Sequence, residues 1–205
     1  MTSIALIHGY AVNLTSPFIR RGFGETAGFT AFADDLHDGT AALFRWGLSE
    51  EVSWLGLVDP VGQLLFYRAE LATALSAETQ ARLREFLEYE QPTVIVVHSM
   101  GATLLYAYAR ANGLPSSVRH VVLVQADLPW DADLDVFPAV HNLYCPWDPT
   151  LVASSAIYGR RRAGLGPVPG NNVINLLLPA NRPPNLHTSA VRDPRLREIV
   201  MHLNK

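Results

Sequence analysis

Short apolar runs recur along the chain at intervals that suit the strands of a sheet. Six runs stand out: Ile4–Ile7, Ala41–Trp46, Thr93–His98, His120–Gln125, Val140–Tyr144 and Val173–Leu178. Several of them, such as Val94–Val97 and Val121–Val124, are continuous and β-branched instead of alternating with polar residues. Continuous runs of this length are typical of strands buried on both faces, which is the usual state of a parallel sheet.

Helical patterns separate most of these runs. The longest pattern extends from Gly62 through Tyr89, and we expect it to break near Ser76, which is a good N-cap followed by an acidic residue in the next turn. Three further helices are expected at Met100–Asn112, Thr150–Arg160 and Pro194–Leu203. The alternation predicts an α/β fold with three α/β/α layers around a doubly wound, mostly parallel sheet of about six strands.

Composition narrows the class of protein. The chain has 205 residues, which suits a single domain over residues 1–205, and only 17% of them are charged, below the average of roughly 25%. A formal net charge of −3 does not indicate the excess of positive charge that is typical of nucleic-acid-binding proteins. The one cysteine, Cys145, excludes an intrachain disulfide and a multi-cysteine metal site. We see no bilayer-spanning apolar run and no signal peptide, so we expect a cytoplasmic protein with no membrane span.

A serine stands at the junction between a buried strand and a helix. Ser99 follows the run Thr93–His98, and the small residues Gly101 and Ala102 begin the next helical pattern. A sharp strand-to-helix turn places the serine hydroxyl above the carboxyl edge of the sheet and brings backbones close together, so small neighbours are needed. The helix N-terminus adds unpaired N–H groups and the positive end of the helix dipole.

The segment His98-Ser99-Met100-Gly101 resembles the Gly-x-Ser-x-Gly nucleophile elbow of the α/β-hydrolase superfamily. The likeness extends over nearly the whole chain and is to compact serine esterases and lipases that lack a separate cap domain. It implies that Ser99 is the nucleophile and that the reaction uses no cofactor and no metal. One position departs from the motif, because Val97 stands where the family has its first glycine. We expect this side chain to crowd the elbow, tilting the helix or filling space elsewhere.

The first strand ends in His8-Gly9-Tyr10, which resembles the oxyanion strand of the same family. The resemblance implies that the backbone N–H groups of Tyr10 and Met100 hold the oxyanion. Gly9 allows the backbone to approach a substrate closely. We expect His8 to be a structural, hydrogen-bonded histidine, since it lies on the oxyanion strand.

Members of this family carry their acid and base after the serine, in that order. Asp148 follows the run Val140–Tyr144, where the family usually carries its acid, although it could also be a turn residue that caps the helix near Thr150. Asp127, after the preceding strand, is the competing acid. His187 follows the last strand and precedes the last helix, which is the place of the family's catalytic histidine.

Three consecutive arginines, Arg160, Arg161 and Arg162, raise the question of a phosphate site. We expect instead a solvated helix end, where cations meet the negative pole of the helix. Glycine-rich phosphate loops and His-Glu-x-x-His zinc motifs do not occur in the sequence.

These residues lead to three functional hypotheses. The first is a serine hydrolase that cleaves carboxylic esters of a small-molecule ester or acyl substrate, through Ser99, His187 and Asp148 and an acyl-enzyme. The second keeps the same triad in a thioesterase, an amidase or a lactonase, because fold does not fix specificity. The third is a non-catalytic binding protein on the same scaffold, which Val97 would allow.

Overall fold

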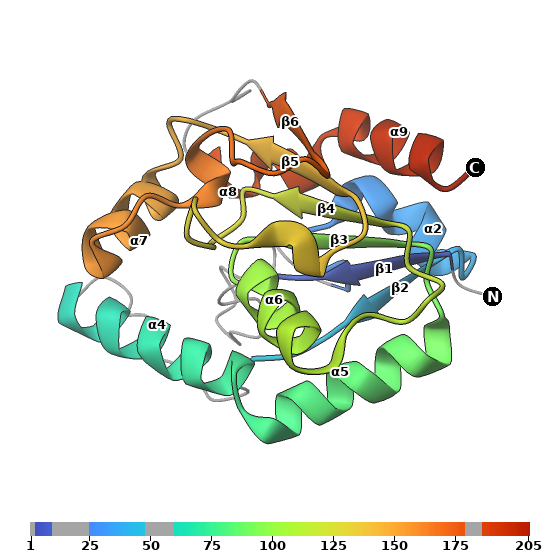
Figure 1. The fold of residues 1–205 in the computed structure, drawn as a ribbon, viewed down its shortest axis with the longest axis horizontal. Helices are drawn as coiled ribbons and strands as arrows, with labels where there is room; N and C mark the ends of the chain where they lie inside the picture. Colours follow the sequence, from blue (N-terminus) through green and yellow to red (C-terminus); the bar gives the residue numbers. More distant parts are fainter. Residues whose placement is uncertain (1–2, 10–24, 48–59, 179–185) are drawn as a thin grey trace.

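The computed structural model describes residues 3–9, 25–47, 60–178 and 186–205, and this part of the chain forms one six-stranded sheet with helices on both faces (Figure 1). The strands are β1 (Ile4–Ile7), β2 (Ala41–Phe44), β3 (Val94–His98), β4 (His120–Val124), β5 (Val140–Tyr144) and β6 (Val173–Leu177). They lie in the order β2-β1-β3-β4-β5-β6, and every pairing is parallel. The predicted α/β class, with a mostly parallel sheet of about six strands, is confirmed.

The described α-helices are α2 (Ala33–His37), α4 (Pro60–Ala74), α5 (Ala77–Glu90), α6 (Gly101–Asn112), α7 (Pro149–Tyr158), α8 (Leu186–Ser189) and α9 (Pro194–Leu203). The predicted break near Ser76 is confirmed, because its Oγ accepts the Thr79 N–H at 3.2 Å and caps α5. Gly113 follows α6 with a φ of 73°, a backbone conformation that glycine adopts more readily than other residues.

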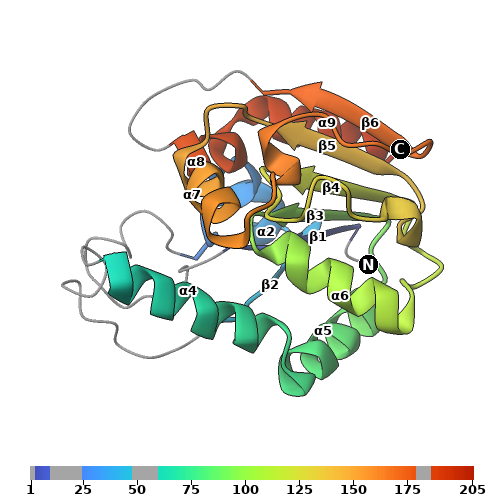
Figure 2. The ribbon, with the colours of Figure 1, turned by 60° about the vertical axis from the view of Figure 1, so that its left-hand side comes forward.

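The sheet is buried on both faces, which explains the continuous β-branched runs. Ile95 and Val97 of β3 belong to a core cluster shared with α5 and α6, whereas Val94 and Val96 belong to a second cluster shared with α9 and the α2 region. Figures 1 and 2 show α5 and α6 on one side of the sheet and α2 and α9 on the other. The three predicted layers are therefore present.

The carboxyl ends of β3, β4 and β5 meet at one edge of the sheet, because the strands are parallel neighbours. Two of these strands end in residues with a left-handed backbone: Ser99 follows β3 with a φ of 52°, and Gln125 follows β4 with a φ of 45°. Each is hydrogen-bonded to the next strand, Ser99 N–H to the Val124 oxygen at 3.1 Å and Gln125 N–H to the Leu143 oxygen at 2.9 Å. The chain therefore turns sharply twice at the edge where a site is expected.

The expectation of a solvated helix end at the three arginines is wrong for Arg162. Helix α7 ends at Tyr158 because Gly159 takes a left-handed φ of 63°, and the chain then turns back toward the segment after β4. Arg160 and Arg161 are exposed, but Arg162 is buried, with its Nε 2.8 Å from Asp127 Oδ1. A buried carboxylate within reach supplies the partner that burial of an arginine requires.

Candidate active site

Ser99 occupies a strained turn between β3 and α6. A left-handed backbone costs a non-glycine residue roughly 1–2 kcal/mol, so surrounding contacts must hold it. Its N–H donates to the Val124 oxygen, while its carbonyl oxygen accepts from the N–H groups of Ala102 and Asp127, both at 3.0 Å. The serine backbone is thus fixed to β4 and to the loop that follows it.

Two glycines allow β1 to pass directly beside this turn. A Cβ on Gly101 would lie 2.5 Å from the carbonyl oxygen of His8 and 2.8 Å from that of Ile7. A Cβ on Gly9 would lie 2.8 Å from the Cβ of Ser99. The small residues predicted for the elbow are therefore required by backbone contacts with the end of β1.

Val97 does not displace the serine. Its side chain is fully buried and belongs to the core cluster shared with α5 and α6. Ser99, two residues later, keeps its left-handed backbone. The crowding expected at this position is absorbed by the core, where the side chain fills space.

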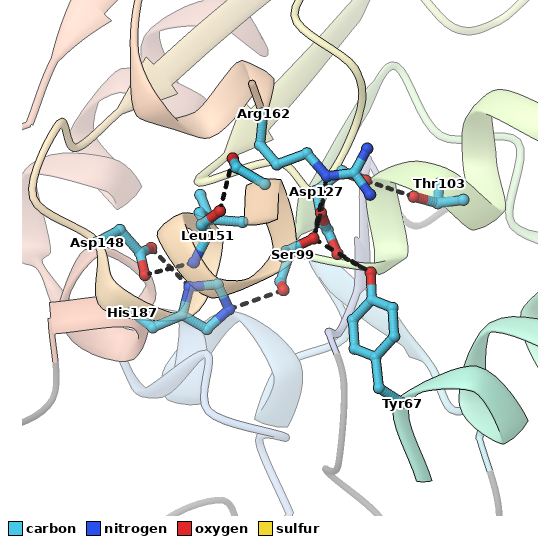
Figure 3. A network of polar contacts seen from close by, with 10 residues as sticks. Tyr67, Ser99, Thr103, Asp127, Asp148, Leu151, Arg162 and His187 are labelled. Atoms are coloured by element: carbon cyan, nitrogen blue, oxygen red, sulfur yellow. Dashed lines mark hydrogen bonds and ion pairs between the residues drawn. The ribbon is translucent and has the colours of Figure 1, made fainter. Parts of the chain in front are cut away.

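Ser99, His187 and Asp148 form a continuous hydrogen-bonded path (Figure 3). The Oγ of Ser99 lies 2.7 Å from Nε2 of His187, and Nδ1 of the same ring lies 2.6 Å from Oδ2 of Asp148. A carboxylate can only accept, so Nδ1 carries the proton and Nε2 is the acceptor for the serine hydroxyl. The arrangement can therefore take a proton from Ser99.

Asp148 has two roles, one for each carboxylate oxygen. Its Oδ1 caps α7 by accepting the N–H groups of Thr150 and Leu151 at 3.0 and 3.2 Å. Its Oδ2 accepts from His187 and from Nε2 of Gln125, both at 2.6 Å. Burial by itself would raise the pKa of Asp148, but the hydrogen bond and charge of His187 and the Leu151 N–H outweigh it and hold the pKa below its ordinary value. The carboxylate is therefore ionised at neutral pH, and it contacts the imidazole and caps α7 at the same time.

His98 lies beside the imidazole of His187. Its Nε2 donates to the carbonyl oxygen of His187 at 2.7 Å, and the two ring centres are 4.8 Å apart. Burial, together with the nearby His187, lowers the pKa of His98 to about 3, so this ring stays neutral. His98 thus contacts the backbone of His187, which the sequence did not predict.

His8 has the structural role expected of it. Its Nδ1 donates to the Gly9 oxygen at 2.7 Å, and its Nε2 accepts the backbone N–H of Trp46 at 3.1 Å. The ring stacks on the Trp46 indole, and burial lowers the pKa of His8 to about 4. Both ring nitrogens are therefore occupied in holding β1 against the end of β2.

Asp127 belongs to a separate buried cluster, made of Tyr67, Asp127, Ser154 and Arg162. Its Oδ1 contacts Arg162 Nε at 2.8 Å and accepts from Ser154 Oγ at 2.7 Å, while its Oδ2 accepts from the Tyr67 hydroxyl. Figure 3 shows Asp127 and Tyr67 of this cluster on the side of Ser99 away from Asp148. Of the two carboxylates considered from the sequence, the structure places Asp148, not Asp127, against the imidazole.

Of the two expected oxyanion donors, Met100 lies within the described residues and Tyr10 does not. Met100 is the N-cap of α6, so its N–H precedes the helical hydrogen-bonding pattern and has no acceptor within the helix. Tyr10 lies outside the described residues. A helix N-terminus next to Ser99 also places the positive end of a dipole near the hydroxyl.

Sequence reasoning missed the contact between Gln125 and Asp148. One signal could have revealed it, because Gln125 is a polar residue placed directly at the end of the apolar run Val121–Val124. That position lies at the same sheet edge as Ser99. The burial of Arg162 had no comparable local signal.

Comparisons with known proteins do not identify a family. No protein-family model matches the chain, and a search of curated proteins also found no match. Within the described residues, no group of three or more histidine, cysteine, aspartate or glutamate side chains could hold a metal ion. None of the described helices has both the length and the apolar character needed to cross a bilayer.

Proposed function

We propose that this chain is a serine hydrolase of the α/β-hydrolase type that cleaves carboxylic esters. One observation carries the proposal: the path from Ser99 Oγ to His187 Nε2 at 2.7 Å, and from His187 Nδ1 to Asp148 Oδ2 at 2.6 Å. A serine hydroxyl is a weak nucleophile until a base within hydrogen-bonding reach takes its proton, and the base works best when a third group orients it. These three residues have the contacts that such roles require.

In the proposed reaction, His187 Nε2 takes the hydroxyl proton as Ser99 Oγ attacks the acyl carbon of the ester. The carbonyl oxygen becomes an oxyanion, and Asp148 stabilises the imidazolium. When the tetrahedral intermediate collapses, the ester C–O bond breaks and the imidazolium gives its proton to the leaving alkoxide. Water then attacks the acyl-enzyme with His187 again as base, which releases the carboxylic acid and restores the Ser99 hydroxyl.

The oxyanion would form next to the N-terminus of α6. We assign the Met100 N–H as one donor, and Tyr10 is the second donor that the family resemblance implies. In a well-studied protease, removal of one such donor raises the barrier by ~2.7–4 kcal/mol. The α6 dipole favours negative charge at the same place.

Labelling with a fluorophosphonate probe tests the nucleophile without knowledge of the natural substrate. We expect the probe to modify Ser99 in the wild type, as seen by peptide mass spectrometry, and not to react with Ser99→Ala or His187→Ala. Ser155→Ala is a matched control, because Ser155 is bonded to the Leu151 oxygen on α7 and lies outside the proposed triad. A folded wild-type protein that leaves Ser99 unlabelled would refute the proposal.

The ester class rests on the resemblance of the elbow to those of esterases and lipases. A panel of p-nitrophenyl esters, matched thioesters and anilides separates it from the alternatives. We expect the highest kcat/KM for the esters. A clear preference for thioesters or anilides would remove the ester assignment and leave the serine nucleophile in place.

A further inference from the structure

Gln125 lies at the end of β4, directly beside the acid of the proposed triad. Its side chain is fully buried, and its Nε2 lies 2.6 Å from Asp148 Oδ2. Its backbone φ is 45°, a left-handed conformation that costs a non-glycine residue roughly 1–2 kcal/mol. Strained residues persist where the surrounding structure holds them, and they concentrate at functional sites.

The contact completes the set of donors around Asp148. Oδ1 accepts two backbone N–H groups at the start of α7, and Oδ2 accepts from His187 and Gln125. These donors come from three different parts of the chain: the end of β4, the start of α7 and helix α8. A side-chain amide does not titrate, so Gln125 holds Oδ2 at every pH without adding a charge beside the imidazole.

We propose that Gln125 is a positioning residue, which fixes the orientation of the Asp148 carboxylate and draws part of its negative charge away from His187. The inference rests on the proposed function, because it assigns Gln125 a role in that same site. Gln125 acts through Asp148 and does not need to touch the substrate. Its left-handed backbone is what aims the amide across the sheet edge from β4 toward the loop after β5.

Loss of the amide has two expected consequences. The carboxylate can rotate about its side-chain bonds, so the imidazole is less well placed and the rate falls. Oδ2 also keeps more of its charge for the imidazole, which favours the protonated ring that is unable to accept the Ser99 proton. Besides Asp148, the titratable side chain described beside the His187 ring is that of His98, whose pKa of about 3 keeps it neutral between pH 5 and 9.

The test is the rate of fluorophosphonate labelling of Ser99 as a function of pH. For Gln125→Met, which keeps the size of the side chain and removes the donor, we expect a maximal rate lower by ~10-fold, because small displacements of catalytic groups have effects of this size or larger. We also expect the acid limb of the pH profile of this variant to move up by about 0.5–1 pH unit, because Asp148 without the Gln125 donor attracts a protonated imidazole more strongly. A merely structural residue would lower stability and leave the acid limb in place.

Two further variants separate the donor from the packing. Gln125→Glu keeps the shape, and two carboxyls that share a site retain a proton, so at about pH 6 it still donates to Asp148 and labels within ~3-fold of the wild type. Asn142→Leu removes another buried amide, one that donates to Gly166 and Asn175 on the far side of β5, and we expect lower stability with an unchanged acid limb.

The outcomes distinguish this inference from the function on which it rests. A folded Gln125→Met protein with the wild-type rate and acid limb would overturn the positioning role, as would a Gln125→Glu protein that labels as slowly as Gln125→Met. A wild type that never labels at Ser99 would instead overturn the proposed hydrolase. If Gln125→Met does not fold, comparison of Gln125→Glu with the wild type decides the inference, because a rate more than ~10-fold lower at about pH 6 would contradict it.

Discussion

His98 donates a 2.7 Å hydrogen bond from Nε2 to the carbonyl oxygen of His187, a residue 89 positions further along the chain. His98 is the last residue of β3, immediately before Ser99, and His187 lies on the short helix α8. The strand that presents the proposed nucleophile therefore also holds the backbone of the proposed base. This hydrogen bond therefore helps to set the distance between Ser99 Oγ and His187 Nε2.

This link predicts that His98→Phe slows the proposed reaction without removing any group that transfers a proton. We expect the labelling rate of Ser99 to fall by ~10-fold or more, because a displacement of about 1 Å can cost 10²-fold. The pKa of His98 is about 3, so the pH profile between pH 5 and 9 should keep its shape. His98→Gln, which retains a donor, should lose less activity, and an unaltered rate in His98→Phe would show that the link is dispensable.

Asp148→Asn should nearly abolish the reaction. An amide at this position can donate to Nδ1 and so favours the wrong tautomer of His187, and the equivalent change in a well-studied protease lowers kcat by about 10⁴. We expect a loss of about 10³–10⁴ in labelling rate by the same mechanism. Asparagine remains a good N-cap for α7, so circular dichroism should show a folded protein.

Asp127→Asn should lower stability strongly and activity only slightly, which is the reverse of Asp148→Asn. It removes the charge that Arg162 faces in the Tyr67–Asp127–Ser154–Arg162 cluster, and breaking a buried pair typically costs about 3–5 kcal/mol. We expect urea unfolding to reveal a loss of this order, with a labelling rate of the folded protein within ~10-fold of the wild type. If Asp127→Asn loses more activity than Asp148→Asn, the assignment of the acid is wrong.

The fold could be predicted from the sequence because its signals are local. The run Val94–Val97 predicts a strand buried on both faces, and Ser76 predicts the start of a helix. Gly101 follows Ser99 at a point where two backbones must come close. Each of these signals consists of a few consecutive residues. The structure then adds how the segments are paired.

Local sequence signals could not decide whether Asp127 or Asp148 is the acid of the proposed triad. Both follow neighbouring parallel strands and reach the same sheet edge, so chain order alone leaves both as candidates. The difference lies in distant partners, because Arg162 returns beyond α7 to hold Asp127 while the imidazole faces Asp148. Such long-range contacts between polar side chains leave no periodic pattern in the sequence.

Gly101→Ala tests the close approach of β1 to the elbow. The added Cβ would meet the carbonyl oxygens of His8 and Ile7 at 2.5 and 2.8 Å, and backbone atoms cannot rotate away as side chains can. We expect α6 to shift, with a cost of about 1–3 kcal/mol as in other overpacked sites. The shift should also lower Ser99 labelling by at least ~10-fold, because the serine is attached to this helix.

Gly113→Ala is the matched control for this variant. Gly113 ends the same helix with a φ of 73°, and a Cβ there would have no neighbour within 4 Å. It should lose about 1–3 kcal/mol from backbone strain and keep the wild-type labelling rate. Equal labelling of Gly101→Ala and Gly113→Ala would show that the elbow tolerates the contact with β1.

His8 and His98 should make the fold less stable in mild acid. Burial lowers their pKa values from 6.5 to about 4 and about 3, so below pH 6.5 the unfolded chain takes up protons that the folded protein excludes. Their stabilisation is complete above that pH and is lost as the pH falls toward the folded values. Each should contribute a slope of up to about 1.4 kcal/mol per pH unit between pH 6 and 4.

Urea unfolding at a series of pH values measures this slope, and His8→Gln and His98→Gln should each flatten it, whatever their stability at pH 7. The lowered pKa values of His120 and His141 act in the same direction, so the informative quantity is the difference in slope between the wild type and each variant. Asp148 also has a lowered pKa, but its ordinary value of 3.8 confines its contribution to more acidic solutions. Slopes that are equal in wild type and variants would mean that the two rings take up protons without unfolding the chain.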